Sequence, residues 1–293
     1  MEDIIIIDNG SYSCKYGYGE REKPEGEVRS VIYYNKKKRR YKIANEKVKE
    51  RKREYPIRNG VIQDIEKMKV IWDEIIYRRL KIKPKEKRIM LSMIDIEDEK
   101  YNEKIKKMML EEYKFKEVGL VNQQILSLNG SERERGIIVD IGYDITRIVA
   151  IYDNYLLKNT LRISNISGRK INEYIKEKKK IKGNEDEIDK KKRKILKKEK
   201  IWEEIIMRGD IIEKIRETIE KSPIDYKKEL KKNIIIIGGT STIKGLCKKI
   251  SEEIKKKEKE IKIRAYKNRK ISSWKGGIKI CKEKKYEKMW EKK

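Results

Sequence analysis

Two short motifs place an aspartate directly after a run of apolar residues and before a glycine. The apolar run at 4–7 leads into Asp-Asn-Gly-Ser at 8–11, and the run at 137–139 leads into Asp-Ile-Gly at 140–142. An apolar run that ends in Asp and Gly is typical of a buried strand that delivers a carboxylate to a tight turn. Carboxylates hold the hydration shell of Mg²⁺, and turn amides bind phosphate oxygens. The repeat therefore predicts two similar lobes that face one cleft.

A third motif follows the apolar run at 234–237, where Gly238, Gly239 and Thr240 precede a predicted helix. A strand, a glycine turn and a helix N-terminus form a corner that binds anions or nucleotides. Alone, the glycine turn is better explained as a plain tight turn, and each Asp alone is fairly explained as the cap of a turn. Their combination favours a nucleotide clamped between two lobes.

Helices are predicted between these motifs, where apolar residues recur with the 3.6-residue period. Asp64 is a candidate N-cap for a helix over 65–80, and the same periodicity marks helices over about 99–113 and 244–258. We interpret their apolar stripes as core rather than as ligand sites.

Composition limits the classes of function that the chain can have. It has 293 residues, and 79 Lys and Arg against 50 Asp and Glu give a formal charge of +29. This length is typical of two domains. Because Glu is interleaved with the basic residues, we interpret the charge as a compositional bias and expect nucleic-acid binding only as a weak electrostatic effect. The charge-rich segments 36–54 and 176–200, with dense basic tracts at 36–40 and 190–200, predict exposed helices or loops.

Absent residue types exclude further chemistry. The chain has no histidine, which excludes His-based triads, His-ligated zinc and an imidazole pH switch. Three scattered cysteines do not predict a thiolate metal cluster, and their odd number fits a reducing compartment. No apolar stretch approaches the roughly 18 residues of a membrane span, so no membrane association is expected.

The motifs together resemble those of actin and the actin-related proteins, within the actin-like ATPase superfamily. The matching landmarks occur in family order over nearly the whole chain: 8–11 with Cys14 and Lys15, 55–57, 59–62, Gln123, Gly168 with Arg169, 198–200, 238–240, Ser273 with Trp274, Gly276 with Gly277, and Met289 with Trp290. The resemblance implies a two-lobed α/β fold, in which each lobe is a ribonuclease-H-like mixed sheet with flanking helices and the nucleotide cleft lies between the lobes. The first lobe would comprise 1–123 and 272–293, as actin subdomain 1 with a reduced subdomain 2. The second would comprise 124–271, as subdomain 3 with a reduced subdomain 4.

The resemblance also implies ATP and Mg²⁺ as ligands. Nucleotide contacts would come from Asn9, Gly10, Ser11, Lys15, Gly142, Lys198, Glu199, Gly238, Gly239 and Thr240. Asp8 and Asp140 would hold the metal through water. Gln123 would be the catalytic residue, because its amide can orient an attacking water although it is too weakly basic to take a proton.

Several cleft positions depart from the family pattern. Tyr12 replaces a glycine, Arg147 replaces a water-orienting histidine, and the second phosphate loop differs at Ile141, Tyr143 and Asp144. A guanidinium can bind phosphate but cannot act as an imidazole. We therefore expect weak or altered nucleotide binding, with ATP hydrolysis slow or absent.

Three functions are weighed from these observations. The first is a divergent, shortened actin-like protein that binds Mg-ATP and has a cytoskeletal or filament-related role in the cytoplasm. The second is an actin-related scaffold subunit of a larger complex, such as a chromatin remodeller or a motor adaptor, with a nuclear location as the alternative. The third, less favoured, is a polyanion-binding pseudo-actin. The expected partners are accordingly actin-like subunits or a larger protein complex.

Overall fold

The computed structural model describes residues 3–94, 98–198 and 201–292. The chain divides into two compact units: unit 1 comprises Met1–Gly130 with Ser273–Lys293, and unit 2 comprises Ser131–Ser272. The chain passes from unit 1 to unit 2 after Gly130, and helix α3 (Gln123–Asn129) packs with strands of unit 1. Within the described ranges, no helix is both long enough and apolar enough to cross a membrane.

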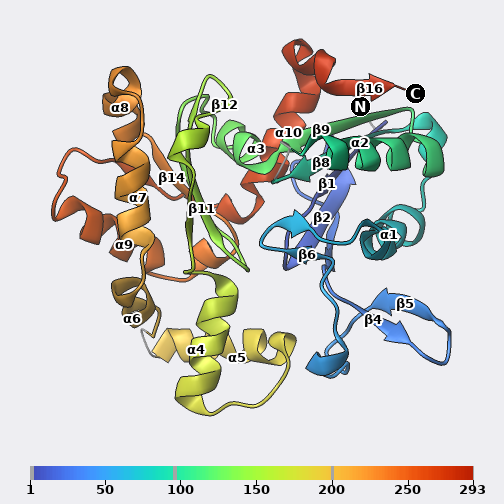
Figure 1. Cartoon of the computed structure of the whole chain (residues 1–293), viewed down its shortest axis with the longest axis horizontal. Coiled ribbons are helices and arrows are strands. Elements are labelled where there is room, and N and C mark those ends of the chain that lie inside the picture. The colour runs from blue at the N-terminus through green and yellow to red at the C-terminus, as the bar shows by residue number, and fades with distance from the viewer. Residues whose placement is uncertain (1–2, 95–97, 199–200, 293) are drawn as a thin grey trace. The chain divides into compact units, whose positions relative to one another are not determined.

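Unit 1 is built on a six-stranded mixed sheet with the strand order β16-β9-β8-β1-β2-β3 (Figure 1). Central strand β1 lies parallel to β8 and antiparallel to β2, and its four isoleucines are fully or almost fully buried. A β-branched run buried on both faces is what a central strand requires. The strands are β1 (Ile4–Asp8), β2 (Ser13–Tyr18), β3 (Gly26–Arg29), β8 (Arg88–Met93), β9 (Glu117–Asn122) and β16 (Trp290–Lys292).

Helices flank this sheet and pack on it to form the apolar core of unit 1. The predicted helix over 65–80 is confirmed as α1 (Ile65–Asp73) and its π-helical continuation η2 (Glu74–Arg79), and the Asp64 side chain caps it by accepting from the Lys67 amide at 3.0 Å. The fully buried Trp72 of α1 packs in the apolar core of unit 1. The remaining helices are α2 (Glu99–Lys107) with η4 (Met108–Glu112), α10 (Ser272–Lys282), and the 3₁₀ segments η3 (Pro84–Glu86) and η8 (Lys284–Met289).

Two small antiparallel ribbons complete unit 1. One pairs β4 (Ile32–Asn35) with β5 (Arg40–Ile43), and the other pairs β6 (Ile57–Arg58) with β7 (Val61–Ile62). Segment 36–54, predicted as helices or loops, thus contains strand β5 as well as the 3₁₀ turn η1 (Glu50–Lys52). The many charges of this segment gave no strand pattern in the sequence. The apolar residues that anchor the ribbon lie at its base, where Ile32 is fully buried and Ile43 packs on the core.

Unit 2 contains a second mixed sheet in the order β12-β11-β10-β14-β15, with β13 paired to β11. Its core is almost entirely isoleucine, drawn from the strands and from the helices that cover them. The strands are β10 (Gly136–Ile141), β11 (Thr146–Tyr152), β12 (Tyr155–Leu156), β13 (Arg162–Ser164), β14 (Ile234–Ile237) and β15 (Ile263–Arg264). The helices are α4 (Gly168–Lys179), α5 (Glu185–Lys198), α6 (Ile201–Arg208), α7 (Ile211–Glu220), α8 (Ile224–Lys231) and α9 (Leu246–Lys255), with 3₁₀ segments η5 (Lys158–Thr160), η6 (Thr240–Thr242) and η7 (Arg269–Ile271).

The two sheets repeat one arrangement around their aspartates. Strands β1 and β10 each end near an Asp, turn into an antiparallel partner (β2 or β11), and lie parallel to a later strand (β8 or β14). The register sets Asp8 opposite Lys15 and Asp140 opposite Arg147. The expected mixed α/β fold with two sheets and flanking helices is therefore confirmed.

Candidate functional site

In unit 1, the carboxylate of Asp8 is buried at the end of β1, with 1% of the residue exposed. Its Oδ2 accepts from the Lys15 ammonium at 2.8 Å, and its Oδ1 accepts from Ser92 Oγ at 2.7 Å and from Gln123 Nε2 at 2.8 Å. Asp8, Lys15 and Gln123, all predicted site residues, thus meet in one hydrogen-bonded cluster. Ser92, which the sequence did not single out, is its fourth member.

The charges of this cluster are fixed by its surroundings. Burial raises the pKa of Asp8, but the Lys15 charge and the three hydrogen bonds outweigh burial and lower this pKa to about 2. The pKa of Lys15 is lowered by burial but raised more by Asp8, and the result is a raised pKa. Burial raises the pKa of the neighbouring Cys14 thiol to about 11. At neutral pH the cluster therefore contains an ionised Asp–Lys pair beside a protonated thiol.

The turn after Asp8 is held by polar contacts on several sides. The backbone N–H of Asn9 donates to Ser92 Oγ at 3.0 Å, and the Asn9 side chain accepts from Trp72 Nε1 at 3.2 Å. Ser11 Oγ accepts from the Gly60 amide at 3.0 Å. The Asn9 amide, predicted to contact phosphate, is thus already bonded within the protein.

Both Asp turns need a glycine for the same steric reason. A Cβ on Gly10 would lie 2.8 Å from the Ser13 carbonyl oxygen, and a Cβ on Gly142 would lie 2.8 Å from the Ile145 carbonyl oxygen. Side chains do not tolerate such contacts with backbone atoms, so only glycine lets either turn close. The repeat seen in the sequence therefore extends to the backbone geometry of the two turns.

In unit 2, the predicted residues after β10 and β14 also lie together. Thr240 Oγ1 donates to the Gly142 carbonyl at 2.8 Å, and a Cβ on Gly238 would come within 2.6 Å of Asp140 Oδ1. By contrast, a Cβ on Gly239 would meet no atom within 4 Å. Asp140, Gly142, Gly238 and Thr240 therefore form one corner, and the backbone at Gly239 borders open space.

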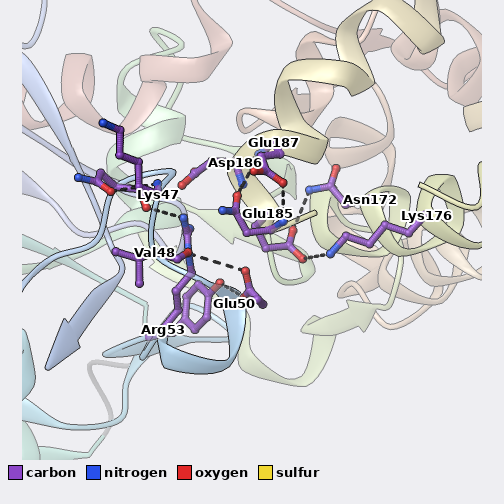
Figure 2. A network of polar contacts seen from close by, with 12 residues as sticks. Lys47, Val48, Glu50, Arg53, Asn172, Lys176, Glu185, Asp186 and Glu187 are labelled. Atoms are coloured by element: carbon purple, nitrogen blue, oxygen red, sulfur yellow. Dashed lines mark hydrogen bonds and ion pairs between the residues drawn. The ribbon is translucent and has the colours of Figure 1, made fainter. Parts of the chain in front are cut away.

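Residues beside this corner form a buried ionic network that the sequence did not predict. Glu185 accepts from Asn172 Nδ2 at 2.9 Å and from Lys176 Nζ at 3.1 Å (Figure 2). It also accepts from the Tyr143 hydroxyl. Burial raises the pKa of Glu185, but these hydrogen bonds and the Lys176 charge lower it to about 2. Tyr143, one of the departures from the family pattern, is thereby held on α5.

Two other residues that depart from the family pattern, Asp144 and Tyr12, contact arginines. The Asp144 carboxylate, 3% exposed, accepts from Arg169 Nε at 2.7 Å. The Arg29 guanidinium lies 3.5 Å from the centre of the Tyr12 ring and donates to the Tyr12 carbonyl at 2.5 Å. Tyr12 is thus held against β3 by a cation–π contact. Of the remaining predicted contacts, Glu199 and the side chain of Lys198 lie outside the described part of the chain.

Each turn by itself offers a single carboxylate, which suits a Mg²⁺ that keeps its water ligands better than a metal held by protein ligands alone. Among the described residues, no group of three or more Cys, Asp or Glu side chains could hold a metal ion together. Mg²⁺ usually keeps several waters and binds one or two carboxylates plus substrate phosphates. Asp8, which is ionised, offers one such carboxylate in unit 1, and Asp140 offers one in unit 2.

Comparison with known proteins identifies relatives over most of the chain. The family model described as actin matches residues 2–206 and 207–293. The chain is 28% identical over 184 residues to actin-related protein 2 of Schizosaccharomyces pombe, covering 58% of this chain and 47% of the relative. It is 26% identical over 187 residues to actin-related protein 2 of Arabidopsis thaliana, covering 59% and 48%. The matched region thus spans about half the length of these curated relatives.

Proposed function

The chain belongs to the actin family, and from this premise we propose that it binds ATP with Mg²⁺ through the two turns that follow Asp8 and Asp140. The observation that carries the proposal is one arrangement that occurs in both units. In each, an Asp lies at a strand end, the turn after it has room only for glycine, and a cationic residue lies opposite the Asp. Turns of this kind bind phosphates through backbone amides and a nearby cation.

The proposed metal ligands are Asp8 and Asp140, acting through water. Bound Mg²⁺ would neutralise charge on the phosphates and help to orient them. Asp8 is suited to this because its pKa of about 2 keeps it ionised at every physiological pH. The Lys15 ammonium, 2.8 Å from Asp8, would offset negative charge where the polyphosphate and its metal bind.

Gln123 is proposed to position water rather than to accept its proton. Asp8 accepts from Gln123 Nε2 at 2.8 Å, which fixes the orientation of the amide. The amide oxygen is then the group that can accept a hydrogen bond from water. An amide is too weak a base to deprotonate that water, so we propose slow hydrolysis or none.

For the biological role, we propose that the chain works with other actin-like subunits in a cytoskeletal, cytoplasmic setting. Both relatives reported above are named actin-related proteins, which supports this reading. A scaffold subunit in a larger complex, including a nuclear one, is the second candidate. The observation that favours it is that Tyr143, which departs from the family pattern, is hydrogen-bonded to Glu185. A subunit that holds its nucleotide only for structure does not need the residues that the family uses for hydrolysis.

Nucleotide binding is tested by thermal unfolding of the whole chain with and without Mg-ATP. A ligand that binds only the folded state at about 100 times its Kd adds about 2.7 kcal/mol of stability. We expect Mg-ATP to raise the Tm of the parent and of an Arg135→Gln surface control. No rise for the parent at millimolar nucleotide would refute the proposed binding.

The variant Gly239→Ala tests whether the nucleotide binds at the proposed site. Since a methyl group there meets no protein atom within 4 Å, it should leave the Tm without nucleotide unchanged. A nucleotide that approaches this backbone would meet the methyl group, and we expect about tenfold weaker binding. Equal affinity in parent and variant would remove Gly239 from the site. Sedimentation with Mg-ATP then separates the two roles, since only a filament-forming protein should pellet.

A further inference from the structure

A large share of the net charge of the chain lies in one part of unit 1. We call residues 36–53 the outer segment; it carries eleven Lys and Arg against two Glu, a surplus of nine charges in 18 residues. The whole chain has +29 over 293 residues, so the outer segment holds nearly a third of the net charge in about a sixteenth of the length. A uniform compositional bias does not produce such a concentration.

The structure presents the densest part of this charge at the tip of a two-stranded ribbon. Strands β4 and β5 pair only with each other as a two-stranded sheet, and residues 36–39 form the turn between them. Figure 1 shows this ribbon standing off the six-stranded sheet of unit 1. At its base, Ile32 exchanges backbone hydrogen bonds of 2.8 Å with Glu54 and is fully buried. Residues 36–40 are all exposed.

The chain that follows the ribbon is also anchored. Arg53 is buried, and its guanidinium donates to the Val48 carbonyl at 3.0 Å (Figure 2). It also donates to the Asn45 carbonyl at 2.7 Å. These bonds fold the loop after β5 back on itself. The ribbon is therefore a positioned feature and not a loose basic tail.

In the part of the chain that the structure describes, no acidic side chain pairs with the cations at the tip. Within the described ranges, Lys36, Lys37, Lys38, Arg39, Arg40 and Lys42 make no ion pair, whereas lysines on helices commonly pair with Glu one turn away, as Lys106 does with Glu103 at 2.8 Å. Partial burial, together with the neighbouring charges of Lys38 and Arg40, lowers the pKa of Lys42. The tip cations thus repel one another, and a bound polyanion would relieve that repulsion.

An aromatic side chain lies on the same ribbon. Tyr34 is 47% exposed, and it contacts its cross-strand partner Tyr41 edge-on, with ring centroids 5.3 Å apart and an angle of 72°. The contact fixes the Tyr34 ring two residues from the first tip cation. A fixed, half-exposed ring beside unpaired cations is the combination by which proteins bind single strands, with bases stacked on the ring and phosphates on the cations.

We propose that the β4–β5 ribbon is a binding site for single-stranded nucleic acid. The tip cations contact successive phosphates, and Tyr34 stacks on a base. An anionic lipid surface fits less well, because its headgroups would pair with the five cations at 36–40 but offer no base to stack on Tyr34. An acidic peptide supplies charge but no base to stack on Tyr34. This site is separate from the turns proposed to hold ATP, and its test does not depend on them.

The test measures binding of the full chain to a fluorescent oligothymidine by anisotropy over a range of salt concentrations. The ribbon variant carries Lys36→Gln, Lys37→Gln, Lys38→Gln and Arg39→Gln. The matched control carries Lys255→Gln, Lys256→Gln, Lys257→Gln and Lys259→Gln, which removes the same charge from exposed lysines at the end of α9. Both variants should keep the Tm of the parent, since all eight side chains are exposed.

We expect the ribbon variant alone to lose affinity. Each phosphate contact on a single strand contributes about 0.7 to the slope of log K against log salt, so losing four contacts should reduce that slope by about 3. The control should keep the slope of the parent. Equal losses in both variants would show that only overall charge matters and would overturn the proposal. So would an unaffected ribbon variant, or a parent whose binding vanishes at about 0.15 M salt.

Tyr34 separates nucleic acid from other polyanions. Tyr34→Ala should weaken binding about 5- to 150-fold with an unchanged salt slope, because stacking and not charge is lost. Tyr34→Phe, which keeps the ring, should bind like the parent. If Tyr34→Ala binds like the parent, or if vesicles of anionic lipid compete better than oligothymidine, the assignment to nucleic acid is wrong.

Discussion

The buried pair of Asp8 and Lys15 allows the most quantitative prediction, for the variant Asp8→Asn. The two side chains are 1% and 13% exposed, and their charged atoms lie 2.8 Å apart. A pKa of about 2 for Asp8 instead of the usual 3.8 corresponds to about 2 kcal/mol of stability at neutral pH. The variant should lose more, about 3–5 kcal/mol, because the Lys15 ammonium stays buried without its counter-charge.

The pH dependence of this loss has a definite sign. The folded pKa of Asp8 lies below its unfolded value, so its contribution is complete above about pH 4 and is lost as the pH falls toward 2. The parent should therefore lose stability in this window. Asp8→Asn has no carboxyl to protonate, and the gap between parent and variant should narrow there.

Tryptophan fluorescence is a suitable assay, since three of the four tryptophans (Trp72, Trp274 and Trp290) belong to unit 1. Lys15→Met in the Asp8→Asn background should recover part of the loss, because it removes the orphaned charge. Asp153→Asn is the matched control: its partner Arg135 lies 2.6 Å away, but the two side chains are 48% and 41% exposed, so we expect no measurable change. Strictly additive effects of the two unit 1 substitutions, or a loss as small as in the control, would refute the reasoning.

Three further predictions concern the remaining features. Gly142→Ala should destabilise unit 2 by about 1–3 kcal/mol, because its Cβ would lie 2.8 Å from the Ile145 carbonyl oxygen; Gly239→Ala should not, and thermal unfolding of both checks this. Glu185→Gln should lower stability above about pH 4.5 by about 3 kcal/mol, and this difference should shrink toward pH 2, as followed by circular dichroism; a difference that is constant with pH would contradict the pKa assignment. Asp64→Ala should cost about 1 kcal/mol through the lost N-cap, Asp64→Ser should recover most of it, and an equal loss in both would contradict a capping role.

Local patterns in the sequence predicted those parts of the site that are close along the chain. Asp8 and Lys15 are seven residues apart and joined by a tight turn, so a hairpin register brings them together. The Asp64 cap and the helix after it follow from a local signal in the same way. The family resemblance added Gln123, whose contact with Asp8 spans 115 residues.

Other parts depended on tertiary register that no local pattern encodes. Ser92 reaches Asp8 only because β8 pairs with β1 in one particular register, and β8, buried on both faces, has no polar and apolar alternation to specify that choice. The one feature of the sequence that could have indicated Ser92 is that it is the single hydroxyl residue in the apolar run of β8. Glu185 was hidden within a charge-rich segment, where buried and exposed carboxylates look alike. The β4–β5 ribbon was missed for a related reason, since its apolar anchors are few and its cations many.

The charge state of the unit 1 cluster bears on what a bound nucleotide could do there. Asp8 has a pKa of about 2, the Cys14 thiol about 11, and the pKa of Lys15 is raised above its usual value. The chain has no histidine, and so no group of this cluster changes its protonation between about pH 4 and pH 9. Efficient general-base catalysis needs a group that titrates near the working pH. A cluster with constant charge instead contributes the same charge to the proposed binding of a metal-bound polyphosphate across that range. The chemistry of these residues therefore favours a retained nucleotide over rapid turnover, in agreement with an amide, and not a base, at position 123.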